Sequence, residues 1–378
     1  MRGLFKKTAF FFLATFTCAT PFCVNAQAKD SLLSLFRPVI QRWTFETRDL
    51  DSLPPVGKDG LIYALQVSGI VVAVRSEDGQ LIWRSETGGE FSAAPTVGQH
   101  EMYVASELGN SSQNGTSETL GGVIRALSMT TGVVLWTRTV PSPIVGTLVI
   151  SDGLLFGASK DGRIYALDSK TGVPVWIKPL QHSFSSTPLI QNEKIYLASD
   201  DGFLIALEMR TGAALWRYRT DSSNRPLFAV MQRTIYLGDA SGYVSALHET
   251  GVGLRALWRK RAGTSIQTLS LTQNGLVVTS LDNFVYFLSY RKGERLWKKQ
   301  MPGRILLQPL IVTGSALFAP LGGEECVALS LADGKQINTI PLGAGNSTIA
   351  SPLIADSLLI IPTRQGLLAF VPSDVTKQ

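Results

Sequence analysis

The chain alternates short apolar segments with turn residues over most of its length. In one stretch "STPLIQ" (186–191), "KIYLASD" (194–200), "FLIALEM" (203–209) and "AALWRYR" (213–219) follow one another, separated by Asn-Glu, Asp-Gly and Arg-Thr-Gly. Alternating β-branched and aromatic residues between such turn residues are typical of strands joined by tight hairpins, because Gly and Asn tolerate the positive φ that these turns need. We therefore predict four antiparallel strands in a unit of about 40 residues.

This unit repeats along the chain. The pattern G-x3-A-x5-G-x3-W occurs unchanged in four copies, and a fifth copy has two extra residues before its tryptophan. The sixth copy keeps its tryptophan but has Phe287 at the alanine position. A fixed period of about this length with four strands per repeat indicates one blade of a β-propeller.

The two ends of the chain complete the count of repeats. The seventh copy has Asn338 in place of tryptophan, and the eighth begins at Gly366 with Phe370 at the alanine position. Trp43, by contrast, lies 40 residues before Trp83 and has no hairpin in front of it. We predict an all-β fold, an eight-bladed β-propeller of four-stranded antiparallel blades, closed by the N-terminal strand joining the C-terminal blade.

The repeated residues have a predicted role in blade docking. A small alanine on the third strand lets neighbouring sheets approach, and a tryptophan on the fourth strand fills the gap between blades. Burying about 150–250 Å² of such a side chain corresponds to about 4–6 kcal/mol of transfer free energy. The tryptophans to which we assign this role are Trp43, Trp83, Trp136, Trp176, Trp216, Trp258 and Trp297.

The N-terminus has the features of a secretory signal. Three basic residues precede the apolar run 8–16, and the small-residue site "VNA" (24–26) follows. We predict a signal peptide over 1–26, cleaved after Ala26, and a single propeller domain over 27–378 in the periplasm or another extracytoplasmic space. An uncleaved anchor is the alternative, although the apolar run is short for a membrane span.

Charge and cysteine content narrow the range of partners. The chain has 35 Lys and Arg against 29 Asp and Glu; without residues 1–26 the basic count is 32, a net charge of +3 that gives no electrostatic case for nucleic acid. Cys18 and Cys23 fall in the predicted signal, and the residues before them do not suit lipid attachment. Cys326 is then the one cysteine of the mature chain, and the acidic residues before it would raise the pKa of a nucleophilic thiol.

The segment "IYALDSKTGVPVW" (164–176) resembles the tryptophan-docking repeat of the PQQ-like β-propeller superfamily, and the likeness extends over nearly all of 38–372. The organisation is closest to that of BamB-type outer-membrane assembly factors, which are periplasmic scaffolds without a cofactor. The resemblance implies a non-enzymatic extracytoplasmic scaffold for protein–protein interactions. Its partners would be envelope proteins, with the outer-membrane assembly machinery among them. We expect a monomer, and peripheral association with a membrane stays open.

The alternative within the superfamily is a PQQ-dependent dehydrogenase, which holds a quinone and calcium. The resemblance to that group would require a vicinal cysteine pair and long insertions bearing carboxylates, and the sequence has neither. His100, His182 and His248 are far apart. We therefore predict no catalytic, cofactor-binding or metal-binding residue. A third reading, a propeller that senses a small ligand or sugar, also stays open.

Partner surfaces are expected where the repeat is interrupted. The joins 178–188 and 219–228 lack the leucine- and arginine-containing loop through which BamB-type proteins reach their barrel partner, but Arg225 and Phe228 in the second join are candidate partner-binding residues. The Ser/Asn/Gly-rich segment 107–122 is predicted to be a flexible loop and is the other candidate. Basic residues around the fifth and sixth copies either prevent edge-to-edge pairing of the outer strands or form a surface that binds an anionic partner. They are Arg255, Arg259, Lys260, Arg261, Arg291, Lys292, Arg295, Lys298 and Lys299.

Overall fold

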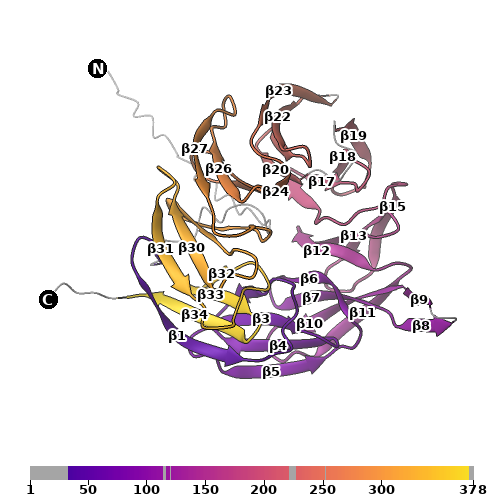
Figure 1. Cartoon of the computed structure of the whole chain (residues 1–378). Helices are drawn as coiled ribbons and strands as arrows, with labels where there is room; N and C mark the ends of the chain where they lie inside the picture. Colours follow the sequence, from indigo (N-terminus) through magenta and orange to yellow (C-terminus); the bar gives the residue numbers. More distant parts are fainter. Residues whose placement is uncertain (1–32, 114–115, 120, 221–226, 252, 374–378) are drawn as a thin grey trace, which may run out of the picture.

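The computed structural model describes residues 33–113, 116–119, 121–220, 227–251 and 253–373, and its regular elements there are all β-strands. The strands form antiparallel, mostly four-stranded sheets arranged around a common centre (Figure 1). The expectation of an all-β propeller is therefore confirmed. The predicted signal peptide, with Cys18 and Cys23, and the candidate Arg225 lie outside the described residues.

The strands of the first half follow the repeat in order. One sheet contains β2 (Val56–Lys58), β3 (Leu61–Gln66), β4 (Ile70–Arg75) and β5 (Leu81–Glu86). The next contains β6 (Phe91–Val97), β7 (Glu101–Glu107), β10 (Gly122–Ser128) and β11 (Val134–Val140). It pairs in parallel, through β6 and β12, with β12 (Ile144–Ser151), β13 (Leu154–Ser159), β14 (Arg163–Asp168) and β15 (Pro174–Pro179). The fourth set is β16 (Leu189–Gln191), β17 (Lys194–Ala198), β18 (Phe203–Glu208) and β19 (Ala214–Arg219).

The second half continues in the same way. Its first sheet contains β20 (Leu227–Met231), β21 (Thr234–Gly238), β22 (Tyr243–Glu249) and β23 (Leu254–Arg261). Its second contains β24 (Ile266–Leu271), β25 (Leu276–Ser280), β26 (Phe284–Leu288) and β27 (Arg295–Gln300). Its third contains β28 (Leu310–Val312), β29 (Ser315–Phe318), β30 (Glu325–Ser330) and β31 (Gln336–Pro341). The last contains β32 (Leu353–Ala355), β33 (Leu358–Thr363) and β34 (Gly366–Pro372), and its fourth strand is β1 (Val39–Glu46).

The strand β1 pairs antiparallel with β34, so the first and last strands that the structure describes share one sheet (Figure 1). Trp43 lies opposite Ala369 and not opposite Phe370, which corrects the position that the repeat spacing assigned to Phe370. The reason is a tighter hairpin: only residues 364–365 separate the paired Thr363 and Gly366. The neighbouring repeats have a longer turn at this point, so their alanine comes one residue later.

The segment 107–122 is more regular than the predicted flexible loop. It contains β8 (Asn110–Gln113) and β9 (Thr116–Thr119), which pair antiparallel and project from the side of the ring (Figure 1). The prediction of an irregular loop overlooked the Asn-Gly pair between the two strands, which is a strong sequence signal for a two-residue hairpin. Serine and threonine in the flanking positions are compatible with a strand.

The apolar core lies between neighbouring sheets. One cluster combines Phe156 and Ile164 with Ile195 and Leu197 of the following sheet, and these side chains have almost no solvent exposure. Other clusters join each sheet to the next in the same manner. The last sheet shares one cluster with β3 and β4 of the first, through residues such as Leu358 and Ile62. Cohesion is therefore distributed around the ring.

Candidate functional site

Each repeat tryptophan reaches from its fourth strand into the next sheet. Trp136 donates a hydrogen bond from Nε1 to the carbonyl oxygen of Ser169 at 2.9 Å. Its ring also covers Gly172, where an added Cβ would lie only 2.5 Å from Cε3 and where φ is +68°. A side chain at this glycine would clash with the indole as well as strain the turn. The absence of a side chain at the glycine of one repeat thus lets the tryptophan of the previous repeat pack against it.

The same arrangement recurs around the ring. The Nε1–H of five further tryptophans donates to a backbone carbonyl of the next sheet at 2.8–3.2 Å, as follows: Trp43 to Ser76, Trp83 to Met129, Trp176 to Met209, Trp258 to Tyr290 and Trp297 to Leu331. On its own sheet, Trp297 lies opposite Phe287, whereas each of the other tryptophans lies opposite an alanine, as Trp176 lies opposite Ala166. The conserved spacing of the sequence pattern therefore corresponds to a set of contacts between sheets.

Trp216 departs from this pattern. Its Nε1 donates to the carboxylate of Glu249 at 2.8 Å, and the same buried carboxylate accepts from Lys194 Nζ at 2.7 Å and from Tyr196 Oη at 3.2 Å. In the fifth repeat, which has two extra residues before Trp258, strand pairing continues to Glu249, opposite Leu254, at the position where the other repeats supply the carbonyl. Burial raises the pKa of Glu249, but these hydrogen bonds and the Lys194 charge outweigh burial and leave the pKa below its ordinary value.

The seventh repeat, which lacks a tryptophan, is completed by the start of the described chain. Asn338 lies opposite Ala328 and donates from Nδ2 to the carbonyl oxygen of Arg37 at 2.8 Å. The adjoining residues Leu33 and Leu35 are 2% and 0% exposed and pack in the cluster between β28–β31 and the last sheet. The N-terminal segment thus packs at the junction between these two sheets.

The opposite face of the fourth strands is solvent-exposed and differs between sheets. The three successive strands β19, β23 and β27 carry nine basic residues and no acidic one. We call the surface formed by the basic side chains of these three strands, on both of their faces, the basic rim. Its cations are Arg217, Arg219, Arg255, Arg259, Lys260, Arg261, Arg295, Lys298 and Lys299. Arg259 forms an ion pair with Asp239 at 3.4 Å, at the surface.

Aromatic rings lie directly beneath cations of the basic rim. Arg217 and Arg219 lie 4.8 and 4.9 Å from the centroid of Phe203, which begins β18. Arg259 lies 3.8 Å from the Tyr243 ring, and Lys298 lies 4.9 Å from the Phe284 ring. Each aromatic residue is half-buried and begins the third strand of its own sheet. Within the described ranges, the cation–π contacts found are these four, and they fall on three consecutive sheets.

The residues singled out from the sequence are not brought together into one centre. Phe228 is the second residue of β20 and packs, half-buried, against the cluster that contains Trp216. His100 lies in an exposed turn and His248 in β22, while His182 contacts the Asp201 carboxylate through Nδ1 at 2.9 Å. Sequence reasoning missed this pair, because residues 19 positions apart give no local signal. The Asp201 carboxylate also accepts from Ser199 Oγ at 2.6 Å, so it is held within its turn.

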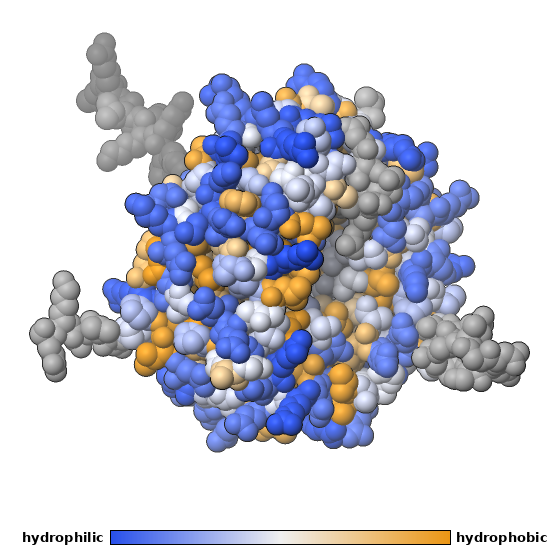
Figure 2. All heavy atoms as spheres, in the orientation of Figure 1, coloured by the Kyte–Doolittle hydropathy of each residue, from blue (hydrophilic) through white to orange (hydrophobic). Residues whose placement is uncertain are grey.

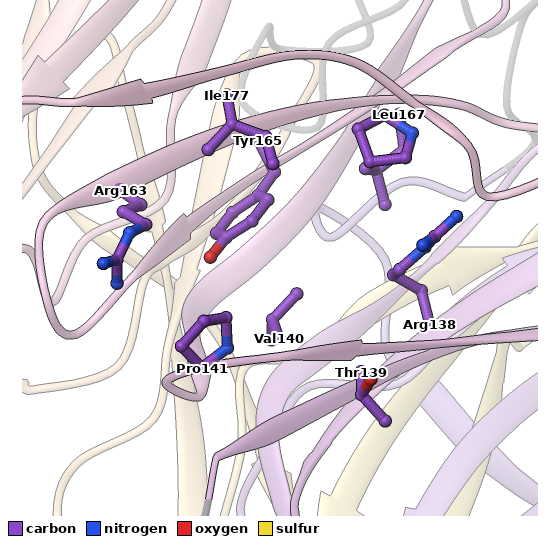
Figure 3. A pocket seen from close by; sticks show the side chains of 9 residues that line it. Arg138, Thr139, Val140, Pro141, Arg163, Tyr165, Leu167 and Ile177 are labelled. Atoms are coloured by element: carbon purple, nitrogen blue, oxygen red, sulfur yellow. The ribbon is translucent and has the colours of Figure 1, made fainter.

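One cavity of about 190 Å³ lies between β11 and the sheet of β14 and β15 (Figure 3). Tyr165, Val140 and Pro141 line its inner part, and Arg138 and Arg163 lie at its sides. Both arginines already have partners: Arg138 Nε donates to the Gly172 carbonyl at 2.9 Å, and Arg163 pairs with Asp161. The volume is below that of sites for drug-sized molecules, which span about 300–1,000 Å³.

The residues do not fit the metal of the dehydrogenase alternative. In the part of the chain that the structure describes, no three His, Cys, Asp or Glu side chains come together as metal ligands, whereas calcium takes six to eight oxygen ligands. Cys326 is fully buried, and burial, with the Glu325 charge, raises the pKa of its thiol to about 12. Among the described residues, no helix could cross a membrane.

The fold of repeated four-stranded sheets with interlocking tryptophans is that of a PQQ-like β-propeller. The sequence profile of the family described as "Outer membrane protein assembly factor BamB" matches residues 40–119, 120–254 and 222–374. Because these matches span most of the chain, the protein belongs to this family.

Solved structures show the same fold at low sequence identity. BamB from Moraxella catarrhalis is 17% identical with a TM-score of 0.69, and the match covers 90% of this chain and 99% of that one. The computationally designed Ika8 protein is 13% identical with a TM-score of 0.72, covering 88% and 99%. Quinohemoprotein alcohol dehydrogenase from Comamonas testosteroni is 12% identical with a TM-score of 0.67, covering 88% and 76%. No sequence of a curated protein matches the chain.

Proposed function

We propose that the protein is a non-enzymatic scaffold of the cell envelope, which binds other proteins in the periplasm after its signal peptide is removed. The observation that carries this proposal is the match of the BamB family over residues 40–374. The sequence of residues 1–26 supports an extracytoplasmic location. Outer-membrane assembly proteins are the proposed class of partner, by analogy with the description of the family.

The proposed architecture is a closed ring of eight four-stranded blades. The strands β6 to β15 that are joined through β6 and β12 form one eight-stranded sheet, and counting it as two blades gives this number. The pairing of β1 with β34 supplies the closure. In this ring the tryptophans hold adjacent blades together and have no chemical role. The hydrogen bond between Ser76 Oγ and the Asp356 carboxylate at 2.6 Å links the first and last sheets and supports the same arrangement.

The competing function is a quinone-dependent dehydrogenase. A dehydrogenase structure does share the fold. The scaffold is favoured because the described carboxylates do not assemble into a calcium site and because Cys326 would be the one cysteine of the mature chain. The resemblance to quinoproteins requires a vicinal cysteine pair against the cofactor, which one cysteine cannot form.

Quinone binding distinguishes the two functions. The mature protein is mixed with pyrroloquinoline quinone and calcium, passed through a desalting column and examined by absorption spectroscopy, and dye-linked alcohol oxidation is measured in parallel. We expect no retained chromophore and no oxidation. A stoichiometric chromophore with alcohol-dependent dye reduction would overturn the scaffold proposal.

A further inference from the structure

We infer that the basic rim is a docking surface for an acidic, partly apolar segment of a polypeptide. This inference rests on the proposed scaffold function and adds the chemistry of the partner. It begins from the three outer strands β19, β23 and β27, where nine basic residues occur without an acidic one. The five other outer strands together carry four basic residues and two acidic ones. Protection of an edge strand alone does not require this concentration of charge, because β11 and β15 each have a single cation.

Four of the nine cations of the rim lie over aromatic rings. The residue that follows each outer-strand tryptophan lies over the aromatic residue that begins the neighbouring third strand: Arg217 over Phe203, Arg259 over Tyr243 and Lys298 over Phe284. The corresponding third-strand residues of the first three sheets are Ile70, Val123 and Arg163, and they provide no ring. A cation resting on a ring loses less conformational freedom when it pairs with a carboxylate. The rim is therefore prepared to bind an anion.

Apolar side chains lie among the cations. Leu215, Leu257 and Leu296 precede the three tryptophans and are 42%, 48% and 54% exposed. Each leucine is the unpaired residue of a β-bulge directly before the tryptophan, and a cation follows two residues later. Arginine forms bidentate pairs with carboxylates, and an exposed leucine gains from contact with an apolar side chain. A segment with both acidic and apolar residues matches this pattern.

The shape of the rim favours a polypeptide over a membrane. The three strands lie on successive sheets along one side of the ring (Figure 1), and each sheet is turned relative to its neighbour. Figure 2 shows mostly hydrophilic residues on one face of the molecule, with smaller apolar patches between them. A planar lipid surface would meet one outer strand at a time, whereas an extended chain can follow several. The outer edges of these strands also offer backbone groups for such a chain.

A matched pair of triple variants tests the inference. The first variant, Arg217→Gln, Arg259→Gln and Lys298→Gln, removes three cations from the rim. The control, Arg84→Gln, Arg138→Gln and Lys178→Gln, removes three cations from the outer strands β5, β11 and β15. The probe is a fluorescent peptide that alternates glutamate and leucine, measured by anisotropy at low and physiological salt. A peptide with glutamine in place of glutamate is the negative probe.

We expect the rim variant to bind the acidic peptide about tenfold more weakly than the wild type, and the control variant to bind it normally. A third variant, Phe203→Leu, Tyr243→Leu and Phe284→Leu, keeps every charge and is expected to weaken binding by about threefold. Circular dichroism checks that each variant is folded.

Three outcomes would overturn the assignment. The first is that the wild type does not bind the acidic peptide. The second is that the rim variant and the control variant bind it equally weakly. The third is that the wild type binds phosphatidylglycerol vesicles and not the peptide. The quinone experiment is independent of all three, so failure here leaves the scaffold proposal standing.

Discussion

The outer strands β15 and β23 have the same inward face and different outward faces. Trp176 and Trp258 both lie opposite an alanine of their own sheet and donate to a backbone carbonyl of the next. Their exposed residues differ: β15 exposes Val175 and Ile177, whereas β23 exposes Leu257 between Arg255 and Arg259. The repeat thus constrains only the face that holds the ring together. The other face is free to differ, and we place partner binding there.

We expect the largest loss of stability when an entire outer strand, with its tryptophan, is removed. Deletion of residues 27–48 removes β1, leaves the edge of β34 unpaired and exposes the surface under Trp43. We expect the free energy of unfolding to fall by more than about 5 kcal/mol, because many buried contacts are lost together. Urea denaturation followed by tryptophan fluorescence measures this change. An unchanged melting transition would show that closure through β1 is not required.

Single tryptophan substitutions test whether the inward face is equivalent around the ring. Trp176→Ala and Trp258→Ala each remove a half-buried indole and its hydrogen bond. We expect each to lower stability by about 3 kcal/mol, with the two values close to one another. Chemical denaturation of both variants under one condition provides the comparison. Values that differ severalfold would contradict the idea that the face is uniform.

Among the contacts that the tryptophans make between sheets, we expect the contact of Trp216 with Glu249 to be the one whose contribution to stability depends on acidic pH. The pKa of Glu249 is below its ordinary value in the folded protein, so its contribution to stability is present above the unfolded pKa of about 4.5. That contribution is lost as pH falls through the lower, folded pKa. Glu249→Gln should cost about 1.5 kcal/mol at neutral pH and should flatten the fall in stability below pH 4.5.

The pH dependence is followed by thermal melting between neutral and acidic conditions. Trp176→Phe is a suitable control, since its junction uses a backbone carbonyl acceptor. If Glu249→Gln and the wild type lose stability in parallel as pH falls, Glu249 does not carry the acid sensitivity.

The smallest expected effects are on the outward face. Val175→Ser and Arg217→Ser change exposed side chains on the two kinds of outer strand. Each should alter stability by about 0.5 kcal/mol or less, because surface substitutions outside buried networks have little effect. Thermal melting checks this. A loss as large as that from Trp176→Ala would mean that the outward face also supports the fold.

Features with a local cause were predictable from the sequence. The hairpins follow from apolar alternation and from glycines such as Gly172, whose positive φ the turn requires. Features that depend on register or on distant contacts were not. The pairing of Trp43 with Ala369, the carboxylate acceptor Glu249 and the contact of Asn338 with Arg37 all needed the three-dimensional structure.

The basic rim lies between these two cases. Its cations can be found in the sequence, and so can its aromatic residues, which come directly after the turn before the third strand. The contact between the cations and the rings depends on which residues are cross-strand neighbours. Phe203 lies opposite Arg219, and Arg217 reaches the same ring from a diagonal position. A search for aromatic residues after the turn together with cations after the tryptophan would have found it.

The central claim, that the protein is a partner-binding scaffold, is tested most directly by photocrosslinking in intact cell envelopes. A photoreactive amino acid is placed at Leu257 on the basic rim and, as a control, at Val175 on β15. We predict a discrete crosslinked protein from position 257, lost when the rim cations are replaced, and none from position 175. No rim-specific crosslink, together with stoichiometric quinone binding, would contradict the claim.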